Sequence, residues 1–260
     1  MHVTPIRARA RPALWPVPLL LLTAALLEGL DLDRRIAHAF FHGSFWLGAG
    51  TNAWWATGLI HGGGRMLVRG AAAAALAWWM LSFRFPPLAR WRREALFVFA
   101  GLVLVTATVG LLKVLTNVDC PWDLAGFGGN RPYLPLFDAR PDYLPAARCF
   151  PGAHSSSGFA LMGLWFALRD RRPRAARFAL WAAVCVGALF SFGQQARGAH
   201  FLSHDLVSAA LAWGILRALH ARMFAVTGIP APASTQSFPT PGIPGYFATN
   251  TTTTKPPAPR

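Results

Sequence analysis

The sequence predicts an all-α fold, a bundle of six transmembrane helices built from a single domain at residues 1–225. Of the 260 residues, 54% are hydrophobic and only 13% are charged, whereas a soluble domain carries about twice that charged fraction. Six segments are long and apolar enough to cross roughly 30 Å of hydrocarbon. These segments are residues 14–30, 66–83, 94–115, 153–169, 176–196 and 201–221.

The first segment is expected to remain in the mature protein. It has no small-residue cleavage site, and the acidic residues Glu28, Asp31 and Asp33 lie at or just after its end. This pattern indicates a retained span rather than a removed signal peptide.

The stretch between the first two segments, residues 31–65, combines few charges with several aromatic residues. We expect it to include an interfacial helix that lies among the lipid headgroups. Such a helix could guide a lipid toward a site, or it could simply anchor the protein. The aromatic residues are Phe40, Phe41, Phe45, Trp46, Trp54 and Trp55.

Arginine-rich stretches predict the orientation. If the six segments alternate across the membrane, all of these stretches fall on one side, which the positive-inside rule assigns to the cytoplasm. Both termini would then be cytoplasmic, in a bacterial inner membrane. The loops 31–65 and 116–152 and the turn around Gln194–Ala199 would face the periplasm. The arginine-rich stretches are residues 7–11, 84–93, 169–177 and 217–222.

Charge and composition also bear on partners. The formal net charge of +15 could suggest nucleic acid, but arginines clustered between apolar segments are typical of topology signals and of contact with anionic headgroups. We therefore expect the lipid bilayer, and no nucleic acid, as a partner, and the oligomeric state stays open. Residues 226–260 are rich in Pro and Thr, which predicts a disordered cytoplasmic tail.

The candidate chemistry lies on the predicted periplasmic side, where the sequence places Lys113, His154 and His200. Two imidazoles can divide the roles of nucleophile and acid near pH 7. Fixed cations such as Lys113 and Arg197 would neutralise the phosphoryl oxygens. The pattern therefore predicts phosphoryl transfer through a phosphohistidine. Isolated histidines at helix ends are more often interfacial polar residues, and His38, His42, His61 and His220 are interpreted in that way.

The start of the fourth segment is a candidate anion site. If the helix begins at Gly152, the backbone N–H groups of Gly152, Ala153 and Ser155 would point at a bound phosphate. The Ser155 hydroxyl could contact phosphate as well, or it could permit close helix packing.

These residues resemble the type 2 phosphatidic acid phosphatase (PAP2) superfamily of membrane-integrated lipid phosphatases, in a variant bacterial branch. The signature of that family is K-x6-R-P, P-S-G-H and S-R-x5-H-x3-D on a six-helix core, and the resemblance covers roughly residues 90–220. Lys113 with Cys120-Pro121 matches the first block, with Cys in place of Arg. Residues 151–154, Pro-Gly-Ala-His, match the second block.

The third block is matched when His200 is aligned with its histidine. Gly193-Gln194 then stand where Ser-Arg is expected, and His204 stands where Asp is expected. The resemblance implies that His200 is the nucleophile that becomes phosphorylated, that His154 is the general acid, and that Lys113 binds phosphate.

The displaced arginines leave two cations to be replaced. Arg197 lies one helical turn beyond Gln194 and could restore the first cation. Arg131 or Arg148 could restore the second if the outer loop folds back. Gln194 or Gln195 could still donate a neutral hydrogen bond.

The partner that orients His200 is ambiguous. On a helix, His204 at i+4 would share the face of His200, whereas Asp205 would lie about 140° away. We favour His204 as the direct partner, with Asp205 behind it setting the tautomer.

Cys120 and Cys149 fall in the same predicted periplasmic loop. A disulfide between them would suit an oxidising compartment and would explain why Cys stands in place of the arginine. A metal site of two cysteines and two histidines is the rival interpretation, but no compact ligand spacing supports it.

The sequence thus predicts an inner-membrane phosphatase that hydrolyses a lipid-linked phosphate monoester or diphosphate at the periplasmic face, without metal or cofactor. By resemblance, candidate substrates are phosphatidate-like lipids, undecaprenyl diphosphate and lipid A phosphates. Two alternatives remain open. A lipid hydroxyl could resolve the phosphohistidine, which would make the protein a phosphotransferase, or the chain could be an inactive lipid-binding or transport protein.

Overall fold

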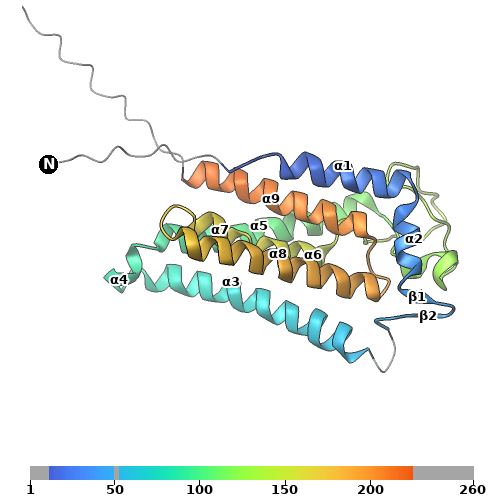
Figure 1. The fold of residues 1–260 in the computed structure, drawn as a ribbon, viewed down its shortest axis with the longest axis horizontal. Coiled ribbons are helices and arrows are strands. Elements are labelled where there is room, and N and C mark those ends of the chain that lie inside the picture. Colours follow the sequence, from blue (N-terminus) through green and yellow to red (C-terminus); the bar gives the residue numbers. More distant parts are fainter. Residues whose placement is uncertain (1–11, 50–52, 225–260) are drawn as a thin grey trace, which may run out of the picture. The chain divides into compact units, whose positions relative to one another are not determined.

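The computed structural model describes residues 12–49 and 53–224. The first arginine-rich stretch and the Pro- and Thr-rich tail lie outside these residues. The described chain is mostly helical, which confirms the all-α class, and its long helices run side by side (Figure 1). The helices are α1 (Pro16–Gly29), α2 (Leu32–His38), a π-helical segment η1 (Trp55–Gly63) that continues into α3 (Gly64–Leu81), α4 (Pro86–Ala89), α5 (Arg92–Thr116), α6 (Ala153–Ala160), α7 (Gly163–Leu168), α8 (Pro173–Ala196) and α9 (Leu202–Met223).

Short elements fill the connections. A hairpin of two strands, β1 (Phe41–His42) and β2 (Phe45–Trp46), follows α2, and two 3-10 turns, η2 (Pro121–Asp123) and η3 (Ala125–Phe127), follow α5. Local sequence explains several helix ends. α8 begins at Pro173, whose fixed φ and missing N–H suit a first helical turn. α5 ends at Thr116, and the next residue, Asn117, adopts the left-handed conformation with φ 52°.

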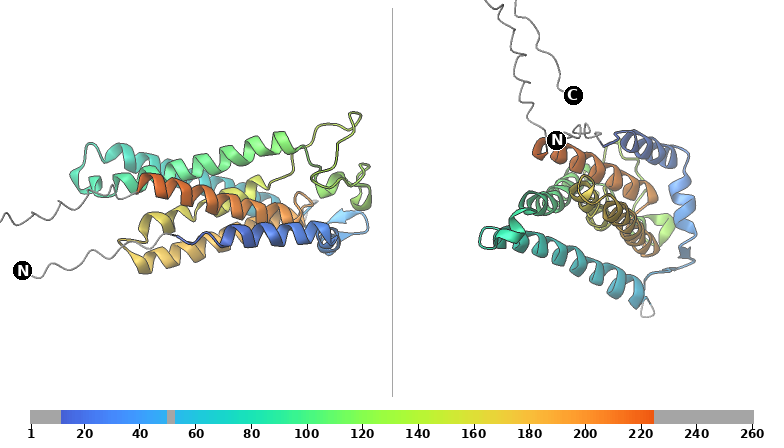
Figure 2. Two further views of the ribbon diagram at one scale, coloured as in Figure 1. Left: turned by 90° about the horizontal axis from the view of Figure 1, so that it is seen from above. Right: turned by 60° about the vertical axis from the view of Figure 1, so that its left-hand side comes forward.

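The core lies where α5, α6, α7, α8 and α9 meet. The side chains of Phe97, Phe166 and Leu216 are essentially inaccessible to solvent there. α6 and α8 approach closely at two glycines, since a Cβ on Gly158 would lie 2.9 Å from the Cα of Gly187. Small residues permit such backbone contact between helices. α1 packs against the outside of α9 and lies beside it in both views of Figure 2.

Two predicted segments have different boundaries in the structure. The helix of the second predicted segment, η1 with α3, begins at Trp55 and not at residue 66. The predicted interfacial stretch, residues 31–65, therefore contains α2, the hairpin and η1. The fourth segment is divided between α6 and α7. At the division, the N–H groups of Leu161 and Met162 bond to carbonyls three residues back, and this tighter 3-10 turn interrupts the α-helix.

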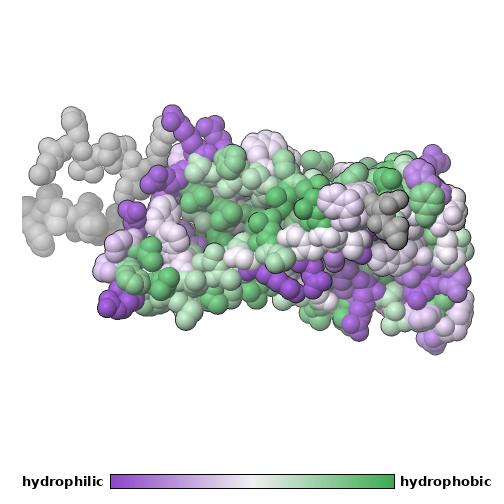
Figure 3. All heavy atoms as spheres, turned by 90° about the horizontal axis from the view of Figure 1, so that it is seen from below, coloured by the Kyte–Doolittle hydropathy of each residue, from purple (hydrophilic) through white to green (hydrophobic). Residues whose placement is uncertain are grey.

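The described helices differ in how well they suit a membrane. Two helical segments, Arg92–Asp123 and Pro173–Ala196, are long and apolar enough to cross one, and α1 is a shorter apolar helix. Large apolar side chains are nevertheless exposed on several helices, and Figure 3 shows a broad apolar area between ends that carry hydrophilic residues. Contiguous exposed apolar surface marks contact with protein or membrane. Exposed examples on α1, α3 and α8 are Leu19, Leu22, Leu26, Met66, Leu67, Met80, Phe178 and Trp181.

The arginine-rich connections gather at one end of α5. Arg171 lies 3.3 Å from Glu94 and also donates to the carbonyl of Arg90. Lys113, near the other end of α5, is about 28 Å away along the helix axis at 1.5 Å per residue. The arginine stretches at 84–93 and 169–177 therefore meet at the end of the helices opposite Lys113.

Candidate active site

The centre of the site is a hydrogen-bonded pair, His200 and Asp205. The Nδ1 atom of His200 lies 2.9 Å from Oδ1 of Asp205, and both side chains are buried. Gln195, near the end of α8, donates from Nε2 to the other carboxylate oxygen at 3.0 Å. A carboxylate acceptor fixes the proton of His200 on Nδ1 and leaves Nε2 with a free lone pair. This tautomer leaves Nε2 of His200 available to act as a nucleophile.

The favoured alternative, His204 as the direct partner of His200, is wrong. Phe201 is extended, with ψ 163°, and α9 begins only at Leu202. His200 therefore precedes the helix, and the i+4 rule does not apply to it. The rings of His200 and His204 are 6.3 Å apart, and His204 packs edge-on against Phe150 instead. Because the chain turns between residues 200 and 202, the carboxylate of Asp205 comes into reach.

The second motif block lies directly against this pair. A Cβ placed on Gly152 would be 2.7 Å from Oδ1 of Asp205 and 2.8 Å from Cε1 of His200. The carbonyl of Gly152 accepts a hydrogen bond from Ser208 of α9 at 2.9 Å. Position 152 consequently has no space for a side chain, and the beginning of α6 is fixed beside His200.

The predicted anion contacts at the start of α6 need correction. The N–H of Gly152 bonds to the carbonyl of His204 at 3.3 Å, so it is not free for phosphate. Ser155 is fully buried, and its hydroxyl bonds to the carbonyl of Gly152, which supports packing rather than phosphate contact. Ala153, the first helical residue, is exposed. The described α6 retains the N–H of Ala153 as a candidate anion donor.

His154, one residue further along α6, has a different environment. Its Nε2 lies 3.2 Å from the carbonyl of Ile60 in η1, and its ring stacks on Phe190 at 4.2 Å. The ring of His61, in η1, lies 4.6 Å from the ring of His154. His200 is within electrostatic range of both imidazoles. The structure thus brings both predicted histidines to one end of the helices, although they have different partners.

Lys113 and Arg197 lie near the histidines. The Nζ of half-buried Lys113 donates to the carbonyl of Arg148 at 2.8 Å, and Lys113 is within electrostatic range of Asp205. Arg197, at the end of α8, donates to Oε1 of Gln194 at 3.2 Å. Gln194 in turn donates from Nε2 to Nδ1 of His61 at 2.7 Å. Burial lowers the pKa of Arg197, but an arginine stays charged near neutral pH.

Arg131 does not replace the arginine of the first block of the family signature, for which Cys120 stands in this chain. Its guanidinium pairs with Asp119, which also accepts two hydrogen bonds from Arg140. These ion pairs hold the connection between α5 and α6 together, because one buried carboxylate binds two arginines from distant parts of the loop. The side chain of Arg148 is exposed, and only its carbonyl reaches Lys113.

The predicted disulfide is confirmed. Cys120 and Cys149 are bonded, with their Cα atoms 5.1 Å apart. Since both thiols are in this bond, the rival metal site of two cysteines and two histidines is contradicted. The disulfide links the connection near Arg148 to the residues that follow α5.

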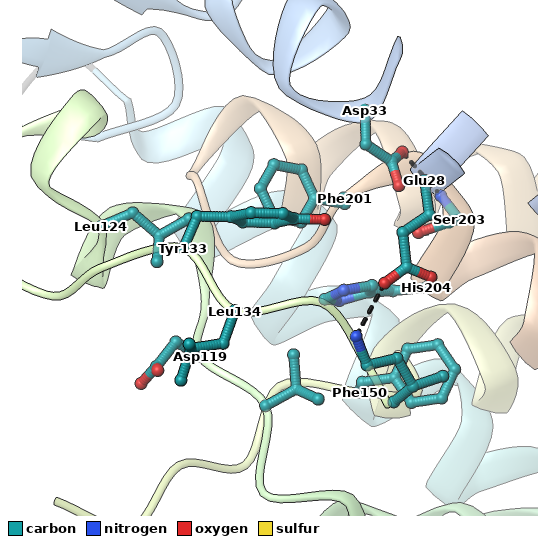
Figure 4. Close-up of a pocket in the computed structure, with 12 residues that line it drawn as sticks. Glu28, Asp33, Asp119, Leu124, Tyr133, Leu134, Phe150, Phe201, Ser203 and His204 are labelled. Atoms are coloured by element: carbon teal, nitrogen blue, oxygen red, sulfur yellow. Dashed lines mark hydrogen bonds between the residues drawn. The ribbon is translucent and has the colours of Figure 1, made fainter. Parts of the chain in front are cut away.

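A small pocket lies behind the His200–Asp205 pair, between α1, α2, the long connection and α9 (Figure 4). Asp33 reaches from α2 to accept the N–H of Ser203 in the first turn of α9 at 3.0 Å. Burial raises the pKa of Asp33, against the hydrogen bonds from Ser203, and burial also raises the pKa of Tyr133 to about 12. Glu28 accepts the N–H of Leu136 at 2.8 Å, so Glu28 is a polar link between α1 and the connection.

The comparison with protein families agrees with this geometry. A family profile described as the PAP2 superfamily matches residues 94–227, that is 134 of the 260 residues. The chain belongs to the PAP2 superfamily. Membership supports a phosphatase-type function, that of a phosphoric ester hydrolase. Neither the search of curated proteins nor the search of solved structures found a match.

The sequence interpretation missed His61. The sequence predicts an interfacial polar residue there, because an isolated histidine at a helix end usually has that role. His61 also lies outside the residues that match the family. In the structure, η1 places it against His154 and Gln194. Only packing between η1, α6 and α8 could have revealed it.

Proposed function

We propose that this protein is a membrane-integrated phosphatase that removes phosphate from a lipid-linked monoester or diphosphate. The observation that carries the proposal is the buried pair His200–Asp205, beside which Gly152 of the second motif block lies so closely that a Cβ there would come within 3 Å of both side chains. Two blocks of a phosphatase signature, far apart in the sequence, thus meet at one imidazole with a fixed tautomer.

In the first step of the proposed reaction, Nε2 of His200 attacks phosphorus and the bond to the leaving oxygen breaks. His154 gives its proton to that oxygen. Asp205 balances the positive charge that the phosphorylated imidazole acquires. In the second step, water attacks phosphorus, the P–N bond breaks, and His154 takes the proton from the water. Inorganic phosphate leaves and both histidines return to their initial states.

Lys113 and Arg197 would supply the positive charge that phosphoryl transfer needs on the non-bridging oxygens. Lys113 comes from the end of α5 and Arg197 from the end of α8, so they approach the catalytic pair from different helices. Arg197 would take over from the arginine that the family has in place of Gln194. The hydrogen bond from Arg197 to Gln194 supports this, since it keeps the guanidinium at the position of the lost side chain.

A lipid substrate and a periplasmic site would follow from the distribution of charge and apolar surface. Large apolar side chains are exposed along α1, α3 and α8, as in helices that contact lipid. The arginine stretches beside α4 and α7 lie at the end of α5 opposite Lys113. If the positive-inside rule holds, six segments cross the inner membrane and the histidines face the periplasm.

The decisive experiment measures phosphate release by detergent-purified protein from a panel of lipid phosphates, with His200→Ala beside the natural chain. We expect release from at least one lipid, an acid-labile phosphoryl adduct on the protein, and loss of both in the variant. His42→Ala, an exposed histidine in β1, is the matched control and should retain full activity. Undiminished phosphate release by His200→Ala would refute the nucleophile, and no release from any lipid would favour a binding or transport protein.

A further inference from the structure

The environment of His154 contains a second imidazole that the reaction described above does not use. The rings of His61 and His154 are 4.6 Å apart at an interplanar angle of 48°. His154 is buried, whereas His61 is half-buried. The two residues come from η1 and α6, so their contact depends on tertiary structure and not on any sequence motif.

Hydrogen bonds fix both rings. Gln194 donates from Nε2 to Nδ1 of His61 at 2.7 Å, so a neutral His61 carries its proton on Nε2. The carbonyl of Ile60, the residue before His61, lies 3.2 Å from Nε2 of His154. Phe190 stacks on the far face of His154 at 4.2 Å. One turn of η1 therefore supplies both the carbonyl that holds His154 and the imidazole beside it.

Electrostatic repulsion limits this pair of rings to one positive charge. Two imidazolium ions at this distance repel each other, and such groups titrate as a unit. Within the described chain, the other groups that act electrostatically on His61 are Arg197 from the end of α8, Arg65 from α3, and His200 before α9. All of them disfavour a second positive charge. Burial, followed by Arg197 and Arg65, lowers the pKa of His61.

We propose that His61 is a positioning residue for the general acid, so that the proton delivered to the leaving oxygen is held by a His61–His154 pair rather than by His154 alone. This inference rests on the proposed phosphatase function. The proton goes from His154 to the leaving oxygen as the P–O bond breaks, and it returns to His154 from water as the P–N bond breaks. His61 orients the ring of His154 and sets the pH at which the pair is protonated.

The test compares two phosphate esters whose leaving groups differ in their need for an acid. Short-chain phosphatidate releases an alkoxide that must be protonated, whereas p-nitrophenyl phosphate releases a stable phenolate. We expect His61→Gln to lower kcat for phosphatidate by about tenfold or more and to change kcat for p-nitrophenyl phosphate little. The alkaline limb of the pH–rate profile should move to higher pH, since a repelling neighbour has been removed.

Two further variants keep the test decisive. Gln194→Leu leaves both imidazoles in place but frees His61, and it also releases Arg197 from its acceptor. It should therefore lower kcat for both esters, with the larger loss for phosphatidate. His42→Gln removes an exposed histidine of β1 and should behave like the natural chain with both substrates. Equal losses on the two esters, or no loss on either, would overturn the role of His61 while leaving the phosphatase function intact.

A titration followed by NMR, which needs no turnover, separates the proposed role of His61 from the proposed phosphatase function. In protein with isotope-labelled histidine, His61 and His154 should titrate as a coupled pair in NMR spectra, and His61→Gln should leave His154 with a single, shifted transition. Independent titration of the two rings would contradict the pair even if the protein is an active phosphatase. Coupled titration in a protein that releases no phosphate would instead refute only the phosphatase function.

Discussion

The two histidines of the candidate site have different kinds of partners. His200 is bound to a carboxylate, Asp205, which is itself held by Gln195. His154 is bound to a backbone carbonyl, stacked on Phe190 and placed beside His61. The difference matches the charge that each imidazole would carry. A nucleophile becomes more positive as it is phosphorylated and gains from a carboxylate, whereas a general acid must release its proton and gains from neutral or repelling neighbours.

The largest effect is expected from a substitution of Asp205, the carboxylate partner of His200. Asp205→Asn keeps the size of the side chain but removes the charge and the preference for a proton on Nδ1 of His200. We expect phosphate release to fall by about 10³- to 10⁴-fold, as for the orienting carboxylate of other histidine-dependent enzymes. Asp138→Asn, an exposed carboxylate of the long connection, is the matched control. Activity within a few-fold of the natural chain would mean that Asp205 does not orient the nucleophile.

The disulfide tests the two histidines separately, because it supports the part of the site that contains His200 and Lys113. Cys149 follows Arg148, whose carbonyl binds Lys113. Cys120→Ser with Cys149→Ser should lower the free energy of unfolding by about 3–4 kcal/mol in the chain-entropy model. Thermal unfolding in detergent would measure this, and activity should fall together with stability.

Cys185→Ser provides the control, since this exposed cysteine of α8 is outside the disulfide. It should leave the unfolding temperature unchanged. If the double variant unfolds at the same temperature as the natural chain, the long connection does not depend on the disulfide.

A substitution of Gly152 tests whether close packing beside His200 is needed for a high kcat. A Cβ at this position would lie within 3 Å of Ser155, Asp205 and His200 and must displace them, and a shift of about 1 Å in a reacting group can cost about 10²-fold in rate. We expect Gly152→Ala to lower kcat by that order while the protein still folds. Gly70→Ala on α3 is the control, because nothing lies within 4 Å of its added Cβ. Equal activity of both variants would contradict the geometry described for the second motif block.

The smallest expected effect concerns Asp33 and pH. Burial raises the pKa of this carboxyl above its ordinary value of 3.8. A raised pKa stabilises the fold below the unfolded value, and this contribution is lost as the pH rises through the folded value. Asp33→Asn keeps an acceptor for the Ser203 N–H without the buried charge.

We therefore expect Asp33→Asn to unfold a few degrees higher than the natural chain at pH 8, with the difference vanishing near pH 3, where both side chains are neutral. Thermal scans at the two pH values would show this. A variant that is less stable at pH 8 would mean that the ionised carboxylate stabilises the start of α9 more than its burial costs.

Much of the site could be predicted from spacing in the sequence. Lys113 lies near the end of the third apolar segment, and His154 and His200 lie at the starts of the fourth and sixth segments. If the segments alternate across the membrane, all three residues fall at one end of the helices. The close approach of Gly152, His200 and Asp205 agrees with that expectation. The pairing of Cys120 with Cys149 also followed from their shared loop. Arg131 was not placed correctly, because a guanidinium can bind several partners and sequence does not say which is nearest. For Ser155 the sequence left phosphate contact and packing open, and its buried hydroxyl bonds to the carbonyl of Gly152.

The sequence by itself determined the helical class, the apolar segments and the group of residues available for phosphoryl transfer, because hydrophobic periodicity and motif spacing are local properties. Only the tertiary structure decided that Asp205 rather than His204 orients His200, since that depends on the extended residue before α9. It also brought His61 to His154, because the packing of η1 against α6 and α8 joins residues that no local pattern connects.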